Sequence, residues 1–196
     1  MDKNGSFSGR ASTGAIAGHD YVDLGLSVKW ATCNVGASSS EGYGDYYAWG
    51  ETSTKSSYDR DNCATYEKEI SDIAGTSRDV ARVKWGGSWR MPTKAEFDEL
   101  IDPDNCTWTL TTQGDHQGYK VISRMNGNSI FLPAAGGRIG PSLYHREENG
   151  YYWSSTPNES DTLSACYLRF SSDRHTTLWY RNDGHTVRPV TEYPCK

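Results

Sequence analysis

The sequence predicts an α+β domain with two short helices, antiparallel sheets and long loops. Hydrophobic residues make up only 35% of the 196 residues, whereas aromatic residues make up 12% and glycine occurs 20 times. This composition favours a loop-rich β domain over a helical bundle. The predicted strands come in runs, and both predicted helices lie between these runs. Such an order is typical of α+β folds rather than of alternating βαβ units.

The first run of strand signals defines the start of the domain. Residues 1–20 are polar and rich in Gly and Ser, so we expect a flexible N-terminal segment followed by one ligand-binding domain over residues 21–196. Apolar residues then recur at every second position, which predicts a strand or hairpin with one buried face. These residues are Val22, Leu24, Leu26, Val28 and Trp30.

Two short helices are predicted next. The first lies within residues 77–87, with Asp79 at its N-terminus and Gly86 at its end. The second begins at Thr93, which forms a T-x-x-E capping box with Glu96. Its apolar stripe predicts contact with the core rather than a cofactor site. The stripe consists of Phe97, Leu100 and Ile101.

The remaining sequence predicts strands joined by turns. Residues 119–125 and 129–134 are separated by Asn-Gly-Asn and predict a hairpin. Further short strands are expected at residues 106–111, 151–156, 165–170, 176–181 and 185–190. We expect the first and last strands of the domain to be adjacent, because their pairing would tie down a loop-rich chain with few aliphatic residues.

The charge of the chain excludes one class of partner. The net charge is −5, the isoelectric point is near 5.5 and the mean hydropathy is −0.75. Non-specific nucleic-acid binding requires a basic surface, so we expect no nucleic-acid partner. No apolar run approaches the length of a membrane span and no signal peptide precedes the domain. We therefore expect no direct membrane insertion.

No motif specifies an enzyme, so we predict no catalytic residues, no metal ligands and no cofactor. The five cysteines contain no C-x-x-C pair, which disfavours zinc knuckles and thioredoxin-like sites. Reduced thiols and one structural disulfide stay as alternatives. Asp115–His116 and Glu147–Glu148 are candidate acid–base or cation-binding pairs, but solvated loop charges are the commoner explanation. A structural calcium ion bound by loop oxygens is compatible with the sequence.

Six phrases in the same order along the chain resemble one family. They are VDLGLSVKWATCNVG, DYYAWGET, WGGSWRMPTKAEF, FLPAAGGR, GYYWSST and GHTVRPV. From about Tyr21 to Val190 the chain is similar to the Fibrobacter succinogenes major paralogous domain of gut Bacteroidetes and their phages. The resemblance implies a C-type-lectin-type fold, related to formylglycine-generating enzymes and to the variable proteins of diversity-generating retroelements. It also implies an adhesin-like or receptor-binding protein on a cell surface, as a lipoprotein, or on a phage virion.

In those variable proteins a fixed scaffold holds a C-terminal ligand face whose codons are rewritten at template adenines. A rewritten AAC codon cannot encode Lys, Glu, Gln, Met or Trp. The first four are absent from Asp161 to His185, and Trp179 is the exception, which must derive from another template codon or be fixed. The positions between the scaffold residues would form the variable face. By this resemblance the scaffold positions would be Trp153, Ser154, Ser155, Ala165, Leu168, Phe170, Arg181, Gly184, Val187, Arg188 and Pro189.

The predicted ligand face combines this resemblance with strand alternation. In residues 165–170, alternation turns Leu168 and Phe170 toward the core and Tyr167 and Arg169 outward. Tyr, Trp and Arg are the residues that dominate recognition surfaces. We expect the members from Tyr167 onward to form one contiguous, solvent-facing patch that binds a protein or glycan on a cell surface. The predicted site residues are Asn158, Ser164, Tyr167, Arg169, Arg174, Thr176, Trp179, Tyr180, Asn182 and Asp183.

Two alternatives stay open. A copper-dependent oxidase of the formylglycine-generating type would need two close cysteines, for which Cys166 and Cys195 are the candidates. We expect these not to meet, and we expect Cys33, Cys63 and Cys106 to be buried or bridged for packing reasons. The other alternative is a structural surface lipoprotein domain that is not diversified. Calcium-dependent sugar binding is not implied, because the Glu-Pro-Asn, Gln-Pro-Asp and Trp-Asn-Asp motifs of sugar-binding C-type lectins are absent from the sequence.

Overall fold

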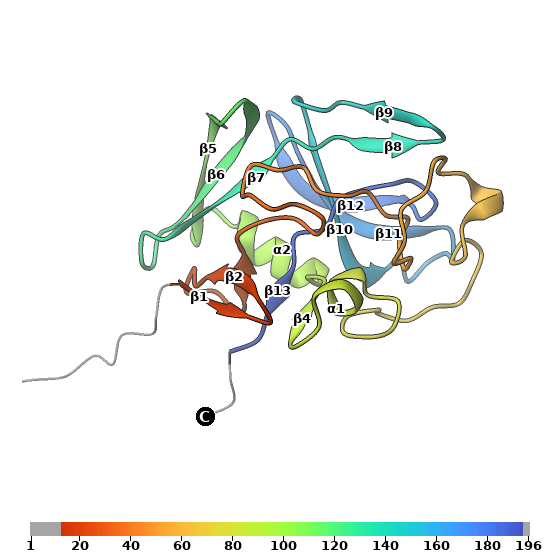
Figure 1. Cartoon of the computed structure of the whole chain (residues 1–196), viewed down its shortest axis with the longest axis horizontal. Coiled ribbons are helices and arrows are strands. Elements are labelled where there is room, and N and C mark those ends of the chain that lie inside the picture. Colours follow the sequence, from red (N-terminus) through yellow and green to blue (C-terminus); the bar gives the residue numbers. More distant parts are fainter. Residues whose placement is uncertain (1–12, 194–196) are drawn as a thin grey trace, which may run out of the picture.

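The computed structural model describes residues 13–193. These residues form mostly β structure with two short α-helices, in several antiparallel sheets, as the sequence predicts (Figure 1). The strands belong to one five-stranded sheet, two three-stranded sheets and one two-stranded hairpin.

The five-stranded sheet joins the two ends of the domain. Its order is β1-β2-β3-β13-β4, and Val190 in β13 pairs with Trp30 in β3 and with Arg90 in β4. The predicted pairing of the two ends of the domain is therefore confirmed, through β3 and β13, with β1 and β2 preceding β3 in the sheet. The strand expected at residues 185–190 is shorter than predicted, because only Val190 of these residues lies in β13. The strands are β1 (Thr13–Ile16), β2 (His19–Val22), β3 (Lys29–Ala31), β4 (Trp89–Arg90) and β13 (Val190–Thr191).

The β1–β2 hairpin begins before residue 21, so the predicted boundary of the folded part is too late. Thr13 pairs with Val22, and the connecting residues Ala17 and Gly18 have φ values of 49° and 80°. These positive φ values are those of a two-residue hairpin turn that suits the twist of the strands. Residues 1–12 of the predicted flexible segment lie outside the described residues. The period-two apolar residues from Val22 to Trp30 are all buried, as predicted.

Both predicted helices are present. Helix α1 (Val80–Trp85) begins at Asp79, whose Oδ1 accepts hydrogen bonds from the amides of Ala81 and Arg82. Helix α2 (Lys94–Ile101) begins with the predicted Thr93–Glu96 capping box. No helix in the described part of the chain combines the length and the apolar character needed to cross a membrane.

Two further antiparallel β units follow α2 in the sequence. Strands β5 (Cys106–Gln113), β6 (His116–Ser123) and β7 (Ser129–Pro133) form an antiparallel sheet, which confirms the hairpin predicted around Asn-Gly-Asn. Strands β8 (Gly137–Ile139) and β9 (Ser142–Tyr144) form a short hairpin. This hairpin lies far from the β1–β2 hairpin in the molecule (Figure 1).

The sheet that positions the candidate site consists of β10 (Gly150–Pro157), β11 (Ser164–Phe170) and β12 (Arg174–Tyr180), with β11 in the middle. Leu168 and Phe170 lie in one core cluster together with residues of α2. Tyr167 lies in a second cluster, with Trp153 and Ala165. All residues that the resemblance assigns to the scaffold are buried.

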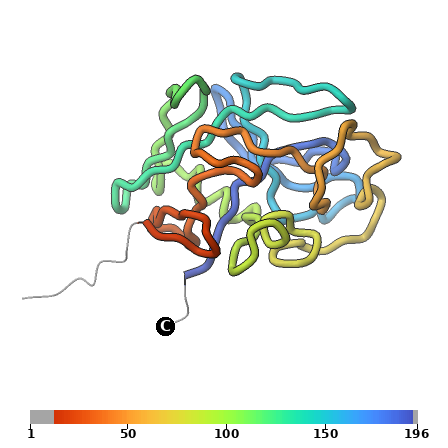
Figure 2. The backbone as a smooth tube through the Cα atoms, in the orientation of Figure 1, coloured from red at the N-terminus to blue at the C-terminus, as the bar shows by residue number. Residues whose placement is uncertain are grey.

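A long segment, residues 32–79, wraps around one side of this sheet (Figure 2). Its one regular element within this fully described stretch is a 3-10 turn, η1 (Arg60–Asn62). The amide of Trp49 donates to the carbonyl of Arg181 at 2.8 Å, and the buried Arg181 guanidinium donates to the carbonyl of Lys68 at 2.8 Å. These bonds fix the segment against the chain end of β12, and they bring η1 next to that end.

Candidate functional site

One face of the β10–β12 sheet carries a cross-strand array of aromatic and polar side chains. Tyr151 in β10 pairs with Arg169 in β11, and Arg169 pairs with His175 in β12. In the next row on this face, Tyr167 pairs with Thr177. Because successive side chains of a strand point to opposite faces, these residues share one face.

A pocket of about 440 Å³ lies on this face, and we call it the aromatic pocket. The β8–β9 hairpin supplies Ile139 and Tyr144 to its lining, and β12 supplies Trp179 on another side. The full lining is Ile139, Tyr144, His145, Tyr151, Tyr167, Arg169, His175, Thr177, Leu178, Trp179 and His185.

His185 forms part of the buried floor of the aromatic pocket. Its ring is fully buried and lies 4.4 Å from Trp153 and 5.1 Å from Tyr167, measured between ring centroids. Its Nε2 lies 3.2 Å from the Tyr144 hydroxyl. Burial lowers the pKa of His185 to about 3, so the ring is neutral at physiological pH. Gly137 permits this packing, because a Cβ there would lie 2.9 Å from Cδ2 of His185.

The rim of the aromatic pocket is polar. Arg169 and His175 are half-buried, and both lie near Asp173, at 3.8 Å and 3.2 Å between nitrogen and oxygen. Tyr167 is buried under the pocket, and this burial raises the pKa of its hydroxyl to about 12. Trp179 is 36% exposed. The pocket therefore offers aromatic faces for stacking and charged groups for orientation.

A second hollow of about 540 Å³ adjoins the first, and we call it the acidic pocket. Ile139 and Trp179 line both pockets and so form a shared wall. The carboxylates of this lining come from η1 and its preceding residue and from the end of β12. The full lining is Tyr58, Asp59, Arg60, Asp61, Ile139, Trp179, Tyr180, Asn182 and Asp183.

Asp183 is the buried carboxylate of the acidic pocket, with an exposed fraction of 4%. Its Oδ2 accepts from the indole Nε1 of Trp179 at 2.5 Å, and its Oδ1 accepts from Nδ2 of Asn182 at 2.6 Å. Burial raises the pKa of Asp183 to about 6 despite these donors and the nearby Arg60. No group of three His, Cys, Asp or Glu side chains that could hold a metal ion is found among residues 13–193.

The predicted ligand face is divided between these two pockets. Tyr167 and Arg169 line the aromatic pocket, Tyr180, Asn182 and Asp183 line the acidic pocket, and Trp179 lines both. The prediction of one solvent-facing patch is wrong, because Tyr167, Asn182 and Asp183 are buried. Tyr167 does point to the predicted face of β11, but the surrounding aromatic rings cover it.

Two predicted residues lie on the opposite face of the sheet. Thr176 donates a hydrogen bond to Oδ1 of Asp98 in α2 at 2.5 Å. The Arg174 guanidinium lies over the Trp108 ring, 5.6 Å from its centroid. Alternation along β12 separates these even-numbered positions from Thr177 and Trp179, and the sequence-based prediction had placed both sets on one surface.

Asn158 and Ser164 line neither pocket. Both hydrogen-bond to Asp161 in the β10–β11 connection, at 2.6 Å from Asn158 Nδ2 and 2.8 Å from Ser164 Oγ. They close the turn that follows β10, so their geometry is that of turn residues.

Several lining residues were not predicted from the sequence. His175 could have been found, because it lies at an even spacing from the predicted Trp179 on β12. Tyr151 had no such signal, because no predicted site residue lies in β10. Asp59 and Asp61 carried no signal, since the sequence around them shows no regular apolar period. Their position depends on how residues 32–79 fold against the sheet.

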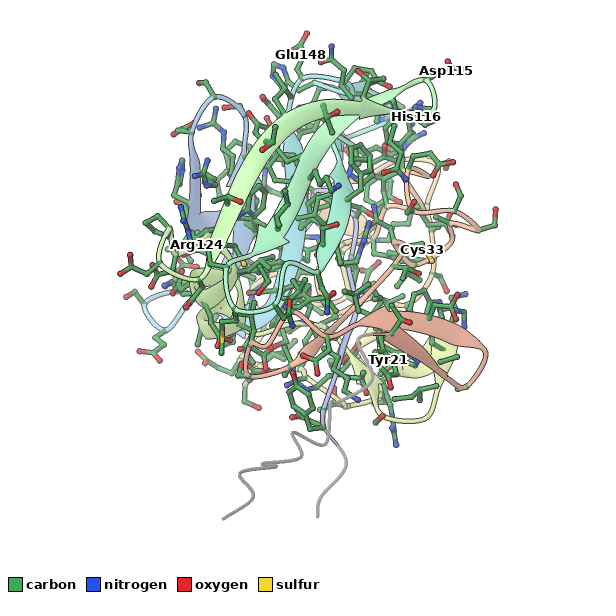
Figure 3. All side chains as sticks on the ribbon, turned by 90° about the vertical axis from the view of Figure 1, so that its left-hand side faces the viewer. Tyr21, Cys33, Asp115, His116, Arg124 and Glu148 are labelled. Carbon is green, nitrogen blue, oxygen red and sulfur yellow. The ribbon has the colours of Figure 1, made fainter. Side chains whose placement is uncertain are left out.

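The charged pairs singled out in the sequence line neither pocket, although Glu148 lies 3.0 Å from Nδ1 of His145, which lines the aromatic pocket. His116 Nδ1 is 3.1 Å from Oε1 of Glu147 and 2.8 Å from the Tyr43 hydroxyl. Asp115, His116 and Glu148 all lie toward the same end of the molecule (Figure 3). Glu147 also accepts from the amide of Gln117 at 2.5 Å. These bonds join the start of β6 to the loop before β10.

The cysteines of the described residues are free thiols. Cys106 and Cys166 are buried, while Cys33 and Cys63 are partly exposed, so burial is confirmed for one of the three cysteines expected to be packed or bridged. Burial raises the pKa of the Cys166 thiol, which opposes formation of a reactive thiolate. Cys195 lies outside the described residues, so the predicted separation of Cys166 and Cys195 stays a prediction.

The comparison with family models finds the Lcl C-terminal domain over residues 22–191. This match covers most of the chain, and the protein therefore belongs to the Lcl C-terminal domain family. The matched span contains the lining of both pockets. It is nearly the span of the sequence resemblance given above, under a different family description. Comparisons with curated proteins and with solved structures give no match.

Proposed function

We propose that this protein is a ligand-binding domain of the receptor-binding or adhesin type, and that it is not an enzyme. The aromatic pocket is its primary site, and the ligand is a protein or glycan displayed on a cell surface. In this proposal the protein itself acts at a cell surface, as a lipoprotein, or on a phage virion.

The observation that supports this proposal most directly is the composition of the aromatic pocket. Aromatic side chains from three strands and a hairpin converge there with a guanidinium. Aromatic rings supply contact area at low cost in conformational entropy, while Arg and His orient polar groups. The side chains project from paired strands, which hold a binding site more rigidly than loops do.

The finer proposal is a C-type-lectin-type scaffold whose C-terminal face is diversified. It is supported by the burial of every residue assigned to the scaffold. It is also supported by the position of half-buried residues such as Arg169, His175 and Thr177 around the pocket. A neighbouring reverse-transcriptase gene and a near-copy of the coding end that differs at adenines would test the diversification directly. Without them, the domain would be a non-diversified surface domain.

An oxidase of the formylglycine-generating type is the alternative enzyme, and the environment of Cys166 does not favour it. The thiol is buried and lies 3.8 Å from the carbonyl of Pro157. Stoichiometric copper(I) binding that disappears in Cys166→Ser would reverse this preference.

The proposed site is tested by binding of the fluorescently labelled domain to a panel of bacterial and host cells, read by flow cytometry. A double variant, Arg169→Ala with His175→Ala, should lose at least ten-fold in cell binding with little change in melting temperature. Leu110→Ala is the matched control, because Leu110 is an exposed side chain (61%) on the separate β5–β6–β7 sheet. Equal binding of the double variant and the wild type would contradict the proposed site.

A further inference from the structure

The acidic pocket is lined by more negatively than positively charged side chains. Three carboxylates line it, from Asp59, Asp61 and Asp183, against the single guanidinium of Arg60. That guanidinium lies over two aromatic rings, 5.5 Å from the centroid of Tyr66 and 5.1 Å from that of Tyr180. The pocket therefore carries excess negative charge when its carboxylates are ionised.

Asp183 has only neutral hydrogen-bond donors. Its two carboxylate oxygens accept from Trp179 and Asn182. Among residues 13–193, no Lys, Arg or His nitrogen forms an ion pair with it. A buried carboxylate without a charged partner is costly, since burial disfavours the ionised form. The raised pKa of this group expresses that cost.

Asn182 adds an acceptor that has no hydrogen-bond partner. It lines the acidic pocket with an exposed fraction of 7%, and its enclosed Oδ1 has no hydrogen-bond partner within the described part of the chain. Buried polar atoms are nearly always hydrogen-bonded, so an exception needs an explanation. Asn182 and Asp183 both line the acidic pocket, so a cationic donor bound there would supply the charge that Asp183 lacks and is the candidate partner for Oδ1 of Asn182.

We infer that the acidic pocket binds a positively charged organic group, an ammonium or guanidinium, carried by a lysine or arginine side chain of a protein ligand. This inference rests on the proposed function, since it concerns the ligand of the aromatic pocket. The shared wall of Ile139 and Trp179 allows one polypeptide segment to place a side chain in each pocket. Ile139 and Trp179 are exposed on that wall, and two further exposed residues line one pocket each, Leu178 the aromatic and Tyr180 the acidic pocket. All four would pack against the segment's apolar residues.

The geometry of the carboxylates favours an organic cation over a metal ion. Asp59, Asp61 and Asp183 do not belong to any potential metal-holding group among residues 13–193. They are distributed around a pocket of about 540 Å³ instead. A Lys or Arg side chain carries several donors at its end and can meet such distributed acceptors. A neutral glycan lacks the charge, and an acidic polysaccharide would be repelled by it.

Paired probes test the inference. The first probe is N-acetyl-lysine methylamide, and the second is N-acetyl-norleucine methylamide, which has the same chain without the charge. Both are titrated into the whole protein while the indole N–H resonance of Trp179 is followed by NMR. The lysine probe should give a saturable shift with at least ten-fold higher affinity than the norleucine probe. Asp183→Asn should remove this preference.

A second variant keeps the test valid if Asp183→Asn disturbs the fold. Asp59→Asn with Asp61→Asn removes two exposed charges and should weaken the lysine probe at least three-fold. The control is Asp104→Asn with Asp115→Asn, which changes the net charge equally at exposed positions that line neither pocket. Equal affinities for the two probes, no saturable shift, or a preference that survives in Asp183→Asn would overturn the inference. If cell binding still depends on Arg169 and His175, the proposed function stands and this inference alone fails.

Discussion

The indole Nε1 of Trp179 donates a hydrogen bond to Oδ2 of Asp183 at 2.5 Å. The bond joins the shared wall of the two pockets to the buried carboxylate of one of them. Trp179 is therefore oriented by a group whose charge depends on pH and on any cation nearby. The charge of Asp183 would therefore affect the binding of a ligand that contacts this ring in the aromatic pocket.

Asp183→Asn should stabilise the protein at pH 8 by up to roughly 3 kcal/mol, because the pKa of Asp183 is raised from 3.8 to about 6. Between these values the folded state holds a proton that the unfolded state has released. Wild-type stability consequently falls as the pH rises through this window. The gain of the variant should thus be complete above pH 6 and vanish near pH 4. Urea unfolding at pH 4 and pH 8 measures it, and a gain of equal size at both pH values would contradict the assigned cause.

His185 should not take up a proton between pH 8 and pH 4.5. Burial lowers its folded-state pKa to about 3, from an ordinary value of 6.5. Below pH 6.5 the unfolded state binds a proton that the folded state does not. This contribution to stability is therefore complete above pH 6.5 and is lost as the pH falls toward 3. NMR of the imidazole resonances reports the residue directly, and a midpoint near 6.5 would show that the ring is hydrated.

Phe170→Ala should lower the free energy of unfolding by about 3–5 kcal/mol, the usual cost of emptying a core aromatic site. The Phe170 ring is fully buried and contacts the rings of Trp108, Tyr119 and Tyr152. Leu110→Ala, at an exposed position, should change the same quantity by within about 0.5 kcal/mol. Denaturant unfolding of both variants gives the comparison. A loss below 1 kcal/mol for Phe170→Ala would mean that the site collapses around the cavity.

Local signals in the sequence predicted much of the fold. The capping box at Thr93 and the turn between β6 and β7 act over a few residues, so their chemistry is visible in the sequence. The adjacency of β3 and β13 was also predicted, because the sequences at both ends of the domain resemble strands. Spacing alone does not predict which side chains of α1 are buried. Val83 has helical spacing from the buried Val80, but it is exposed.

The sequence predicted which strands carry the site, but it did not predict which other segments pack around it. Alternation correctly turned Leu168 and Phe170 into the core, but it could not reveal that Tyr167 would be covered by neighbouring rings. The acidic pocket needs η1 beside the end of β12, and that contact joins residues more than 100 positions apart in the sequence. Such a contact depends on the packing of an irregular segment, for which neither period nor propensity gives a signal.

The most direct test of ligand binding in the aromatic pocket is to fill that pocket. Thr177 lines it from β12 and is half-buried, and phenylalanine is well suited to a strand. In Thr177→Phe the added ring would occupy the pocket while the acidic pocket and the core stay intact. Cell binding by the labelled domain, measured together with the melting temperature, should fall at least ten-fold with the melting temperature within a few degrees of the wild type. Undiminished binding by this folded variant would contradict the account.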